Sequence, residues 1–434
     1  MNPKTMLTLF GLDADSYSVE PIISETESEI DIFITLNDDN PRRCPYCHSS
    51  NVVIKETREI RISYSVLKHQ SKPIFILLTK RKYFCKKCHK TYMQKTELVR
   101  QKHTISNETC WTIHEKCKEI ISFKSITKFL SISEPTVRTI FNEMVKIGRS
   151  ALPTALCIDE KRFSTNYGKY ICIISNPFNG TIVDVINSRT NPYLFDYFSK
   201  ISPSERKNVK YFVSDMFEGY RTIKRKFFPD AIHIIDHFHV TKLFTDVLQK
   251  MRKQYMYTLE KDDIEYKFIK KNWRLFLYNP YLKKNIGLSL RTDFNTGEIV
   301  DIKELMKRSL RKSNYLLEIY NLYSDYCEYL NYGFDDKYLN ESLEFIINKA
   351  LNSTNTEIQR IGATLLNFYN EILNYYLSKN KYKLSNATAE SINNLVSKLI
   401  SISYGIKDFL LFRKRLLYIS STKKEGDFHP PQIF

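Results

Sequence analysis

After Pro153 the chain alternates short apolar runs with helical patterns, and the order of these elements constrains the fold more than any other sequence feature. Apolar periodicity predicts, in chain order, strands at 154–159, 169–176 and 181–188, a helix at 192–201, a strand at 209–215, a helix at 220–228 and a strand at 231–236. The sequence therefore predicts an α/β domain built on a single sheet.

This β-β-β-α-β-α-β order is typical of the ribonuclease H-like fold, in which the first and fourth strands are neighbours. Asp159 ends the first predicted strand and Asp215 ends the fourth. Two such carboxylates side by side predict a site for Mg²⁺ or Mn²⁺, which prefer oxygen ligands and keep positions open for water and phosphate. Glu160 adjoins Asp159, but adjacent strand residues face opposite sides, so Asp159 is the preferred ligand. Glu390 supplies a third acid, on a helix that we expect to pack beside the sheet.

Four of the nine cysteines form two Cys-x-x-Cys pairs, made of Cys44, Cys47, Cys85 and Cys88. Four thiolates are the tetrahedral set that a structural Zn²⁺ prefers. The long segment between the pairs is β-rich, which favours a zinc ribbon with extended strands over a helical finger. His48 and His89 each follow a pair and are expected beside the metal. The alternatives are two separate redox pairs, or a ribbon that has lost its metal.

From Asn107 the pattern becomes helical, and residues 124–146 are typical of a helix-turn-helix. The first helix is predicted to bury Ile126, Phe129 and Leu130. Pro135 opens the second helix, where its missing N–H has no cost. The polar face of that helix would enter a DNA major groove with Thr136, Arg138, Thr139 and Asn142. Any three-helix packing unit shows the same apolar stripe, so a purely structural role stays open.

The charge of the chain is large and uneven. The whole chain carries +18, and residues 1–40 hold nine acids and one base, so the remaining residues carry +26. A positive net charge of this size favours a polyanionic partner such as nucleic acid, although a lysine-rich composition alone would also produce this charge. No apolar run approaches the ~20 residues of a membrane helix. We expect a soluble cytoplasmic protein without a membrane partner.

The predicted fold class is multidomain α+β. Its segments are a β-rich zinc-binding domain at 1–98, a helix-turn-helix domain at 99–150, the first part of a ribonuclease H-like catalytic domain at 151–239, an α-helical insertion at 240–385, and the last part of the catalytic domain, with the Glu-bearing helix and a basic C-terminus, at 386–434.

Three motifs in the second half of the chain resemble a known family. They are LCIDE at 156–160, VSDMFEGYRTIKRKFFPDAIHIIDHFHV at 213–240, and ESINN at 390–394 followed by SYGIKDFLLFRKRLL at 403–417. In their order and spacing, with the cysteine pairs and the helix-turn-helix before them, they resemble the DDE transposases of the bacterial insertion-sequence family ISL-three. The resemblance covers nearly the whole chain.

The resemblance implies a catalytic triad of Asp159, Asp215 and Glu390, supported by Asp236 and His239 in an Asp-x-x-His step. Three features differ from the family pattern. Serine follows the glutamate where glycine is usual, His237 stands where arginine is common, and the basic stretch after the Asn-Asn pair is reduced to Lys398.

The predicted function is DNA transposition by metal-dependent strand cleavage and strand transfer, with catalytic Mg²⁺ or Mn²⁺ and structural Zn²⁺. The expected partner is double-stranded DNA, both the terminal inverted repeats and the target, bound by a homodimer in association with the bacterial nucleoid. Lys398, Arg413 and Arg415 are predicted DNA contacts. The alternatives are a DNA-binding regulator derived from a transposase and a nuclease that does not join strands. A tyrosine recombinase is disfavoured, because no cluster of Arg and His surrounds one Tyr.

Overall fold

The computed structural model describes residues 7–8, 12–13, 15–38, 42–69, 72–100, 102–165, 168–277, 290–293, 296–332, 336–379, 386–402 and 408–422. The chain forms two compact units, the first of residues 1–148 and 395–434 and the second of residues 149–394. No helix among the described residues is both long enough and apolar enough to cross a bilayer.

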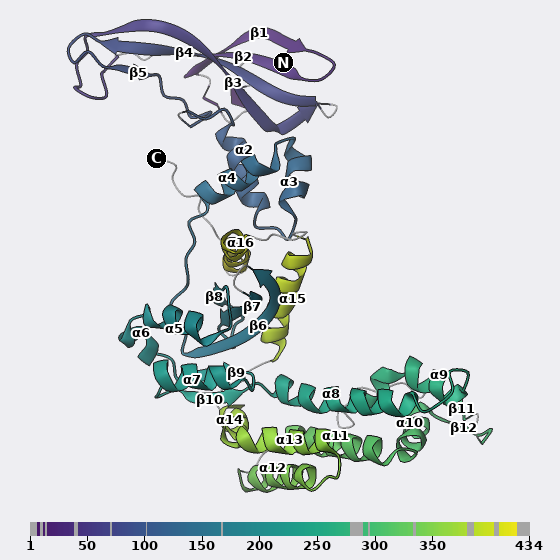
Figure 1. Cartoon of the computed structure of the whole chain (residues 1–434). Helices are drawn as coiled ribbons and strands as arrows, with labels where there is room; N and C mark the ends of the chain where they lie inside the picture. The colour runs from purple at the N-terminus through teal and green to yellow at the C-terminus, as the bar shows by residue number, and fades with distance from the viewer. Residues whose placement is uncertain are drawn as a thin grey trace. The chain divides into compact units, whose positions relative to one another are not determined.

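A twisted sheet occupies the N-terminal part of the first unit (Figure 1). Its strands are β1 (Tyr17–Glu25), β2 (Ile30–Leu36), β3 (Val52–His69), β4 (Lys72–Cys85) and β5 (Thr91–Met93). The order is β1-β2-β4-β3 with β5 beside β4, and β2 runs parallel to β4. Alternate residues of β2 and β4 are buried, as expected for strands with one face on a core. The predicted β-rich N-terminal region is confirmed.

Three helices follow the sheet, α2 (Asn107–Lys116), α3 (Phe123–Leu130) and α4 (Glu134–Met144). A serine precedes each of them and accepts a hydrogen bond from a backbone N–H of the first turn, which is a strong helix-start signal. Ile126 and Leu130 are fully buried, but Phe129 is 56% exposed, so its predicted place in the core is wrong. The inward stripe of the short helix α3 runs through Phe123, Ile126 and Leu130. Phe129 lies on the flank, where the Lys116 ammonium covers its ring.

The last described helix, α16 (Phe409–Thr422), packs against these three helices within the first unit. Arg415 is 1% exposed and donates to the carbonyl oxygens of Glu119 at 3.2 Å and Ile121 at 2.8 Å. Tyr418 Oη lies 2.8 Å from Nε2 of His114 on α2. Two predictions are thereby corrected. Arg415 binds backbone carbonyl groups in the core and is not available as a DNA contact. Helix α16 packs with the N-terminal helices and not with the catalytic domain.

The sheet of the second unit has the order β10-β9-β6-β7-β8 (Figure 1). Its strands are β6 (Ala155–Thr165), β7 (Gly168–Ser175), β8 (Ile182–Ile186), β9 (Tyr211–Ser214) and β10 (Ile232–Ile235), and its helices are α5 (Asn191–Ser199), α6 (Pro203–Lys207) and α7 (Glu218–Phe227). β6, β9 and β10 are parallel, whereas β7 and β8 are antiparallel to their neighbours. The predicted order of elements is confirmed except for the short helix α6, which the sequence did not indicate, and the pairing of the first strand with the fourth is confirmed.

Asp159 does not end its strand as predicted. β6 pairs with β9 only as far as Cys157 but continues along β7, where Asp159 is opposite Ile173 and Arg162 opposite Tyr170. Hydrogen bonds to β7 thus extend β6 beyond the point where β9 stops. Asp159 lies inside a strand, at the level where the parallel part of the sheet ends.

A mostly helical segment follows β10 directly. Its elements are α8 (His237–Met256), α9 (Ile264–Lys271), η1 (Trp273–Leu277), β11 (Leu290–Thr292), β12 (Ile299–Asp301), α10 (Ile302–Arg311), α11 (Asn314–Tyr332), α12 (Asp336–Leu351), α13 (Thr356–Asn367) and α14 (Tyr369–Lys379). The predicted helical insertion is present, with a short hairpin that the sequence did not indicate. Phe244 and Tyr326 of the insertion share one apolar cluster with Val213, Ile234 and Ile235 of the sheet. The insertion and the sheet therefore have a common core.

Candidate functional site

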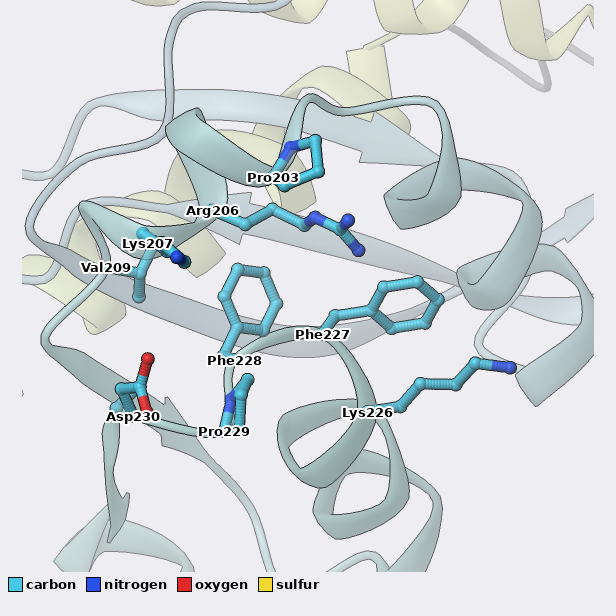
Figure 2. Close-up of a pocket in the computed structure, with 10 residues that line it drawn as sticks. Pro203, Arg206, Lys207, Val209, Lys226, Phe227, Phe228, Pro229 and Asp230 are labelled. Carbon is cyan, nitrogen blue, oxygen red and sulfur yellow. The ribbon is translucent and has the colours of Figure 1, made fainter.

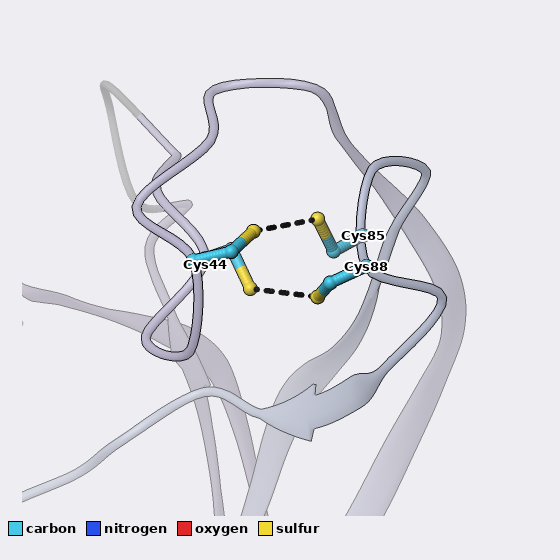
Figure 3. A group of neighbouring side chains, drawn as sticks. Cys44, Cys85 and Cys88 are labelled. Atoms are coloured by element: carbon cyan, nitrogen blue, oxygen red, sulfur yellow. Dashed lines mark hydrogen bonds between the residues drawn. The ribbon is translucent and has the colours of Figure 1, made fainter.

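The four predicted zinc ligands come together at one end of the N-terminal sheet (Figure 3). Their positions follow from the β3–β4 hairpin, in which Val52 pairs with Cys85 and so brings the first cysteine turn beside the second. The Sγ atoms of Cys44 and Cys88 are 3.6 Å apart, as are those of Cys47 and Cys85. All four lie within 4.8 Å of one another. Tetrahedral Zn–S bonds of about 2.3 Å require sulfur atoms about 3.8 Å apart, so these thiols fit a structural zinc ion.

Both cysteine turns have the same backbone geometry. His48 and His89, the residues after the pairs, have φ angles of 57° and 56°, and each backbone N–H donates at 2.9 Å to the carbonyl oxygen of the first cysteine of its pair. A further backbone donor, the N–H of Cys88, lowers the pKa of the Cys85 thiol to about 7. The two histidines are not part of the close ligand group, which contains the cysteines alone.

A second group of functional side chains lies at the carboxyl ends of the parallel strands in the other unit. Continuing the β6–β9 register beyond the Cys157–Val213 pair puts Asp159 level with Asp215. Asp236 follows β10 and donates its backbone N–H to the Ser214 carbonyl at 3.0 Å. Asp215 and Asp236 thus follow β9 and β10, and Asp159 lies within β6 at the same level as Asp215. These carboxylates lie farther apart than the four cysteine thiols. Among the described residues, the cysteines are the only group of three or more possible metal ligands whose ligand atoms lie within 4.8 Å of one another.

Asp159 is bonded on both carboxylate oxygens. Oδ1 accepts from the Glu160 backbone N–H at 2.7 Å and lies 3.8 Å from Nε2 of His239. Oδ2 accepts from Nδ2 of Asn393 at 2.9 Å. Asn393 belongs to α15 (Asn386–Ile402), which is separated from β6 by more than two hundred residues of sequence. The contact places this part of α15 beside the strand that carries the first acid.

Asp215 lies in a crowded and largely desolvated position. The pKa of its carboxyl is raised to about 6, mainly by burial and also by the nearby charges of Glu160 and Asp159, against the lowering effects of His239 and of a backbone hydrogen bond. Its Oδ1 accepts from the Phe217 backbone N–H at 3.0 Å. Carboxylates that repel one another out of water form a site that a bound cation would stabilise.

The remaining predicted residues of this site have distinct positions. Glu390 lies in the helical backbone of α15, one turn before Asn393, but its side chain is outside the described residues. Asp236 is the N-cap of α8 and accepts from the Phe238 backbone N–H at 3.1 Å. His239, in the first turn of α8, faces Asp159. The Asp-x-x-His step thus both starts a helix and brings an imidazole to the carboxylates.

Two features of the site were missed by the sequence reasoning. Glu160 forms an ion pair with Arg189, whose guanidinium lies 4.7 Å from the Tyr170 ring centroid and 5.3 Å from that of Phe217. The guanidinium of Arg189 therefore neutralises the charge of Glu160, the residue next to Asp159. Asn393 was visible in the ESINN motif, but nothing in the sequence indicated that its amide would bond Asp159.

The predicted DNA-facing residues of the first unit are largely accessible. Thr139, Asn142 and Lys398 are exposed, while Thr136, Arg138 and Arg413 are half-buried. Arg138 is paired with Glu134 at 2.9 Å. Lys414 of α16 donates to the backbone oxygen of Asn142 at 2.9 Å, close to the C-terminus of α4. Thr139 and Asn142 thus lie on the exposed face of α4, and the role of this face in DNA reading stays a prediction.

A cavity of about 190 Å³ lies elsewhere in the second unit (Figure 2). Arg206 and Lys226 line it together with Phe227 and Phe228, and the Arg206 guanidinium lies 5.2 Å from the Phe227 ring centroid. Its walls include residues that precede β9 and β10, whereas the carboxylates follow these strands. The cavity is therefore separate from the carboxylate site.

Two comparisons with protein-family models cover both sites. Residues 156–416 match a family described as a transposase, the ISL3 group of DDE transposases. Residues 40–88 match a family described as the zinc-finger of transposase IS204/IS1001/IS1096/IS1165. No curated protein matched the chain. The first match contains Asp159, Asp215 and Glu390, and the second contains all four cysteines of the N-terminal site.

Proposed function

Because the chain belongs to the ISL3 family of DDE transposases, we propose that it cuts DNA at the ends of its own insertion sequence and joins these ends to a target. The proposed metal ligands are Asp159, Asp215 and Glu390. Magnesium, or manganese in its place, supplies at such a site a bound water of lowered pKa and positive charge beside the leaving 3′ oxygen.

The observation that best supports this proposal is the hydrogen bond from Asn393 to Asp159. Residues three apart on an α-helix lie on the same side of it, one turn from each other. Since Asn393 touches the first acid, a glutamate one turn earlier on α15 is suitably placed to complete the set begun by Asp159 and Asp215. This support comes from helix geometry and the backbone of α15.

In this proposal the side chains at the carboxylate site have two roles, metal binding and the positioning of Asp159. The three carboxylates would hold the cations at the site where the scissile phosphodiester binds. Asn393 holds Asp159 in position by a hydrogen bond to Oδ2, and the His239 imidazole lies beside Oδ1 at 3.8 Å. No covalent bond between protein and DNA is needed. In the first step water displaces the 3′ oxygen from a phosphodiester at the element end, and in the second the freed 3′ hydroxyl displaces a 3′ oxygen from a phosphodiester of the target.

The first unit would provide DNA recognition. Zn²⁺ bound by the four cysteines would hold the turns of the ribbon together. The exposed face of α4, with Thr139 and Asn142, would read the terminal inverted repeats in a major groove, and Lys398 and Arg413 would contact phosphates. We propose that two copies of the chain act together on the paired ends, in the cytoplasm and in association with the nucleoid.

A strand-transfer assay tests this function. The purified protein is incubated with Mg²⁺, a supercoiled target plasmid, and short duplexes that carry the two ends of the element. We expect duplexes joined to the plasmid, and none with the Asp159→Asn variant. Cleaved but unjoined duplexes would indicate a nuclease. Specific binding without cleavage would indicate a regulator.

A further inference from the structure

A buried polar network joins the last helix of the insertion to the catalytic sheet. Glu371 of α14 accepts a hydrogen bond at 2.9 Å from Nε of Arg221 on α7. The same carboxylate oxygen lies 3.8 Å from Nδ1 of His233 on β10. Asn374, about one turn further along α14, donates to the His233 carbonyl oxygen at 2.9 Å. α14 is therefore tied both to the helix after β9 and to β10 itself.

The network continues to the residue that precedes the second acid. Nε2 of His233 lies 2.9 Å from the Ser214 hydroxyl, which donates at 2.9 Å to the Asp215 carbonyl oxygen. Ser214 is 1% exposed and is the last residue of β9. Its own carbonyl accepts the Asp236 backbone N–H at 3.0 Å. Ser214 is thus bonded to both segments from which Asp215 and Asp236 project.

The Arg221 side chain is largely buried and bonds to acceptor groups of α7, α13 and α14. Its side chain is 9% exposed, and it donates to Glu218 at 3.0 Å and to the Asn367 carbonyl at 2.7 Å. Its guanidinium lies 4.1 Å from the centroid of the Phe368 ring. A buried ion pair adds little net stability, because the desolvation of two charges offsets their attraction, but its directional bonds fix the relative position of the elements that it joins.

We propose that Glu371 and Arg221 are positioning residues for the transposition reaction, through which the helical insertion holds β10 and the end of β9, and with it Asp215, in the position that metal binding requires. β9 has four residues, and Asp215 lies directly beyond its last ladder pair. Beyond that pair the backbone of Asp215 is held by the Ser214 hydroxyl, and through it by the buried network. The inference rests on the proposed function, in which Asp215 is a metal ligand.

The test compares two isosteric variants in the same insertion. Glu371→Gln keeps the size of the side chain and removes its charge from the network. Glu357→Gln is the matched control, because Glu357 forms ion pairs with Lys250 and Arg360 that do not involve the sheet. Two quantities are measured: the Mg²⁺ concentration that half-saturates cleavage of element-end DNA, and the affinity of the free protein for Mn²⁺ by electron paramagnetic resonance.

Groups that orient metal ligands typically change metal affinity by about 10–100-fold when they are removed. For Glu371→Gln we expect the half-saturating Mg²⁺ concentration to rise, and Mn²⁺ affinity to fall, by at least about tenfold. Saturating Mn²⁺ should restore most of the cleavage rate, and binding of end DNA without metal should be unchanged. Glu357→Gln should behave as the wild type in every measurement.

Ser214→Ala provides an independent variant in case Glu371→Gln fails to fold. It removes one hydroxyl from the network and should shift metal dependence in the same direction. Wild-type metal dependence in a folded Glu371→Gln variant, or in Ser214→Ala, would overturn the positioning role. Asp215→Asn is measured in parallel: if that variant still cleaves DNA with normal metal dependence, the proposed catalytic function is wrong, which is a different result.

Discussion

The cysteine site and the carboxylate site differ in how much of the chain is needed to build them. The four thiols come from two short turns joined by a single hairpin, and their sulfur atoms are already at tetrahedral spacing. The proposed carboxylate ligands come from two strands and from a helix that returns after the whole insertion. Metal binding at the cysteine site can therefore stabilise the ribbon that carries it. The carboxylate site, assembled from distant segments, instead depends on the stability of the surrounding core.

The largest effect should follow from loss of a cysteine ligand. In Cys85→Ser, the ribbon should lose its zinc and unfold, because binding of structural zinc contributes about 10–16 kcal/mol to the folding of such small domains. Circular dichroism and elemental analysis would follow both changes, with the wild type expected to contain one zinc per chain. Cys110→Ser, a buried cysteine outside the ligand group, is the control. A folded Cys85→Ser protein that retains zinc would contradict the assignment.

Loss of a carboxylate ligand should instead spare the fold and abolish the reaction. Asp215→Asn removes the charge that attracts cations, and it also relieves a carboxylate whose pKa burial raises to about 6. We expect the melting temperature to stay equal or to rise, while DNA cleavage falls by more than about a thousandfold, equivalent to about 4 kcal/mol. Gel-based cleavage and thermal melting measure the two effects.

Glu160→Gln is the matched control for the carboxylate series, since Glu160 is paired with Arg189. We expect the Glu160→Gln variant to retain cleavage, because the Glu160 carboxylate is already paired with Arg189 and is not needed as a metal ligand. The ligand assignment would have to move to Glu160 if Glu160→Gln were inactive while Glu390→Gln remained active.

The same contrast between local and distant contacts explains what the sequence could predict. The cysteine pairs were recognisable because spacing alone identifies them, and the strand order was readable because each element has its own periodicity. The position of Arg415 was predicted wrongly, because its burial depends on the packing of α16, which comes from the far end of the chain. Phe129 was predicted wrongly for a local reason, because the short helix α3 buries only the stripe of Phe123, Ile126 and Leu130. Likewise, the extension of β6 beyond Asp159 depends on pairing with β7. The side chain of Glu390 lies outside the described residues, and its role stays a prediction.

A smaller effect is expected at Asn393, the contact that brings the two distant parts of the carboxylate site together. Asn393→Ala removes the 2.9 Å hydrogen bond to Asp159 and should lower cleavage by about 10–100-fold, with a matching rise in the Mg²⁺ requirement. Asn394→Ala, at the next and exposed position of α15, is the control. Equal activity of the two variants would show that α15 is held at the site by other contacts.

The smallest effect should come from His239. Its Nε2 is 3.8 Å from Asp159 Oδ1, which is beyond hydrogen-bond distance, and the same oxygen already accepts the Glu160 backbone N–H at 2.7 Å. His239→Ala should therefore reduce cleavage only a few-fold, with the start of α8 still capped by Asp236. His239→Gln, which keeps a polar group at this position, should lie between the alanine variant and the wild type. The measurement is the single-turnover cleavage rate at saturating Mg²⁺. A loss as large as that of Asp215→Asn would mean that the imidazole contacts DNA or metal directly, and that the carboxylate site extends to a fourth element of the chain.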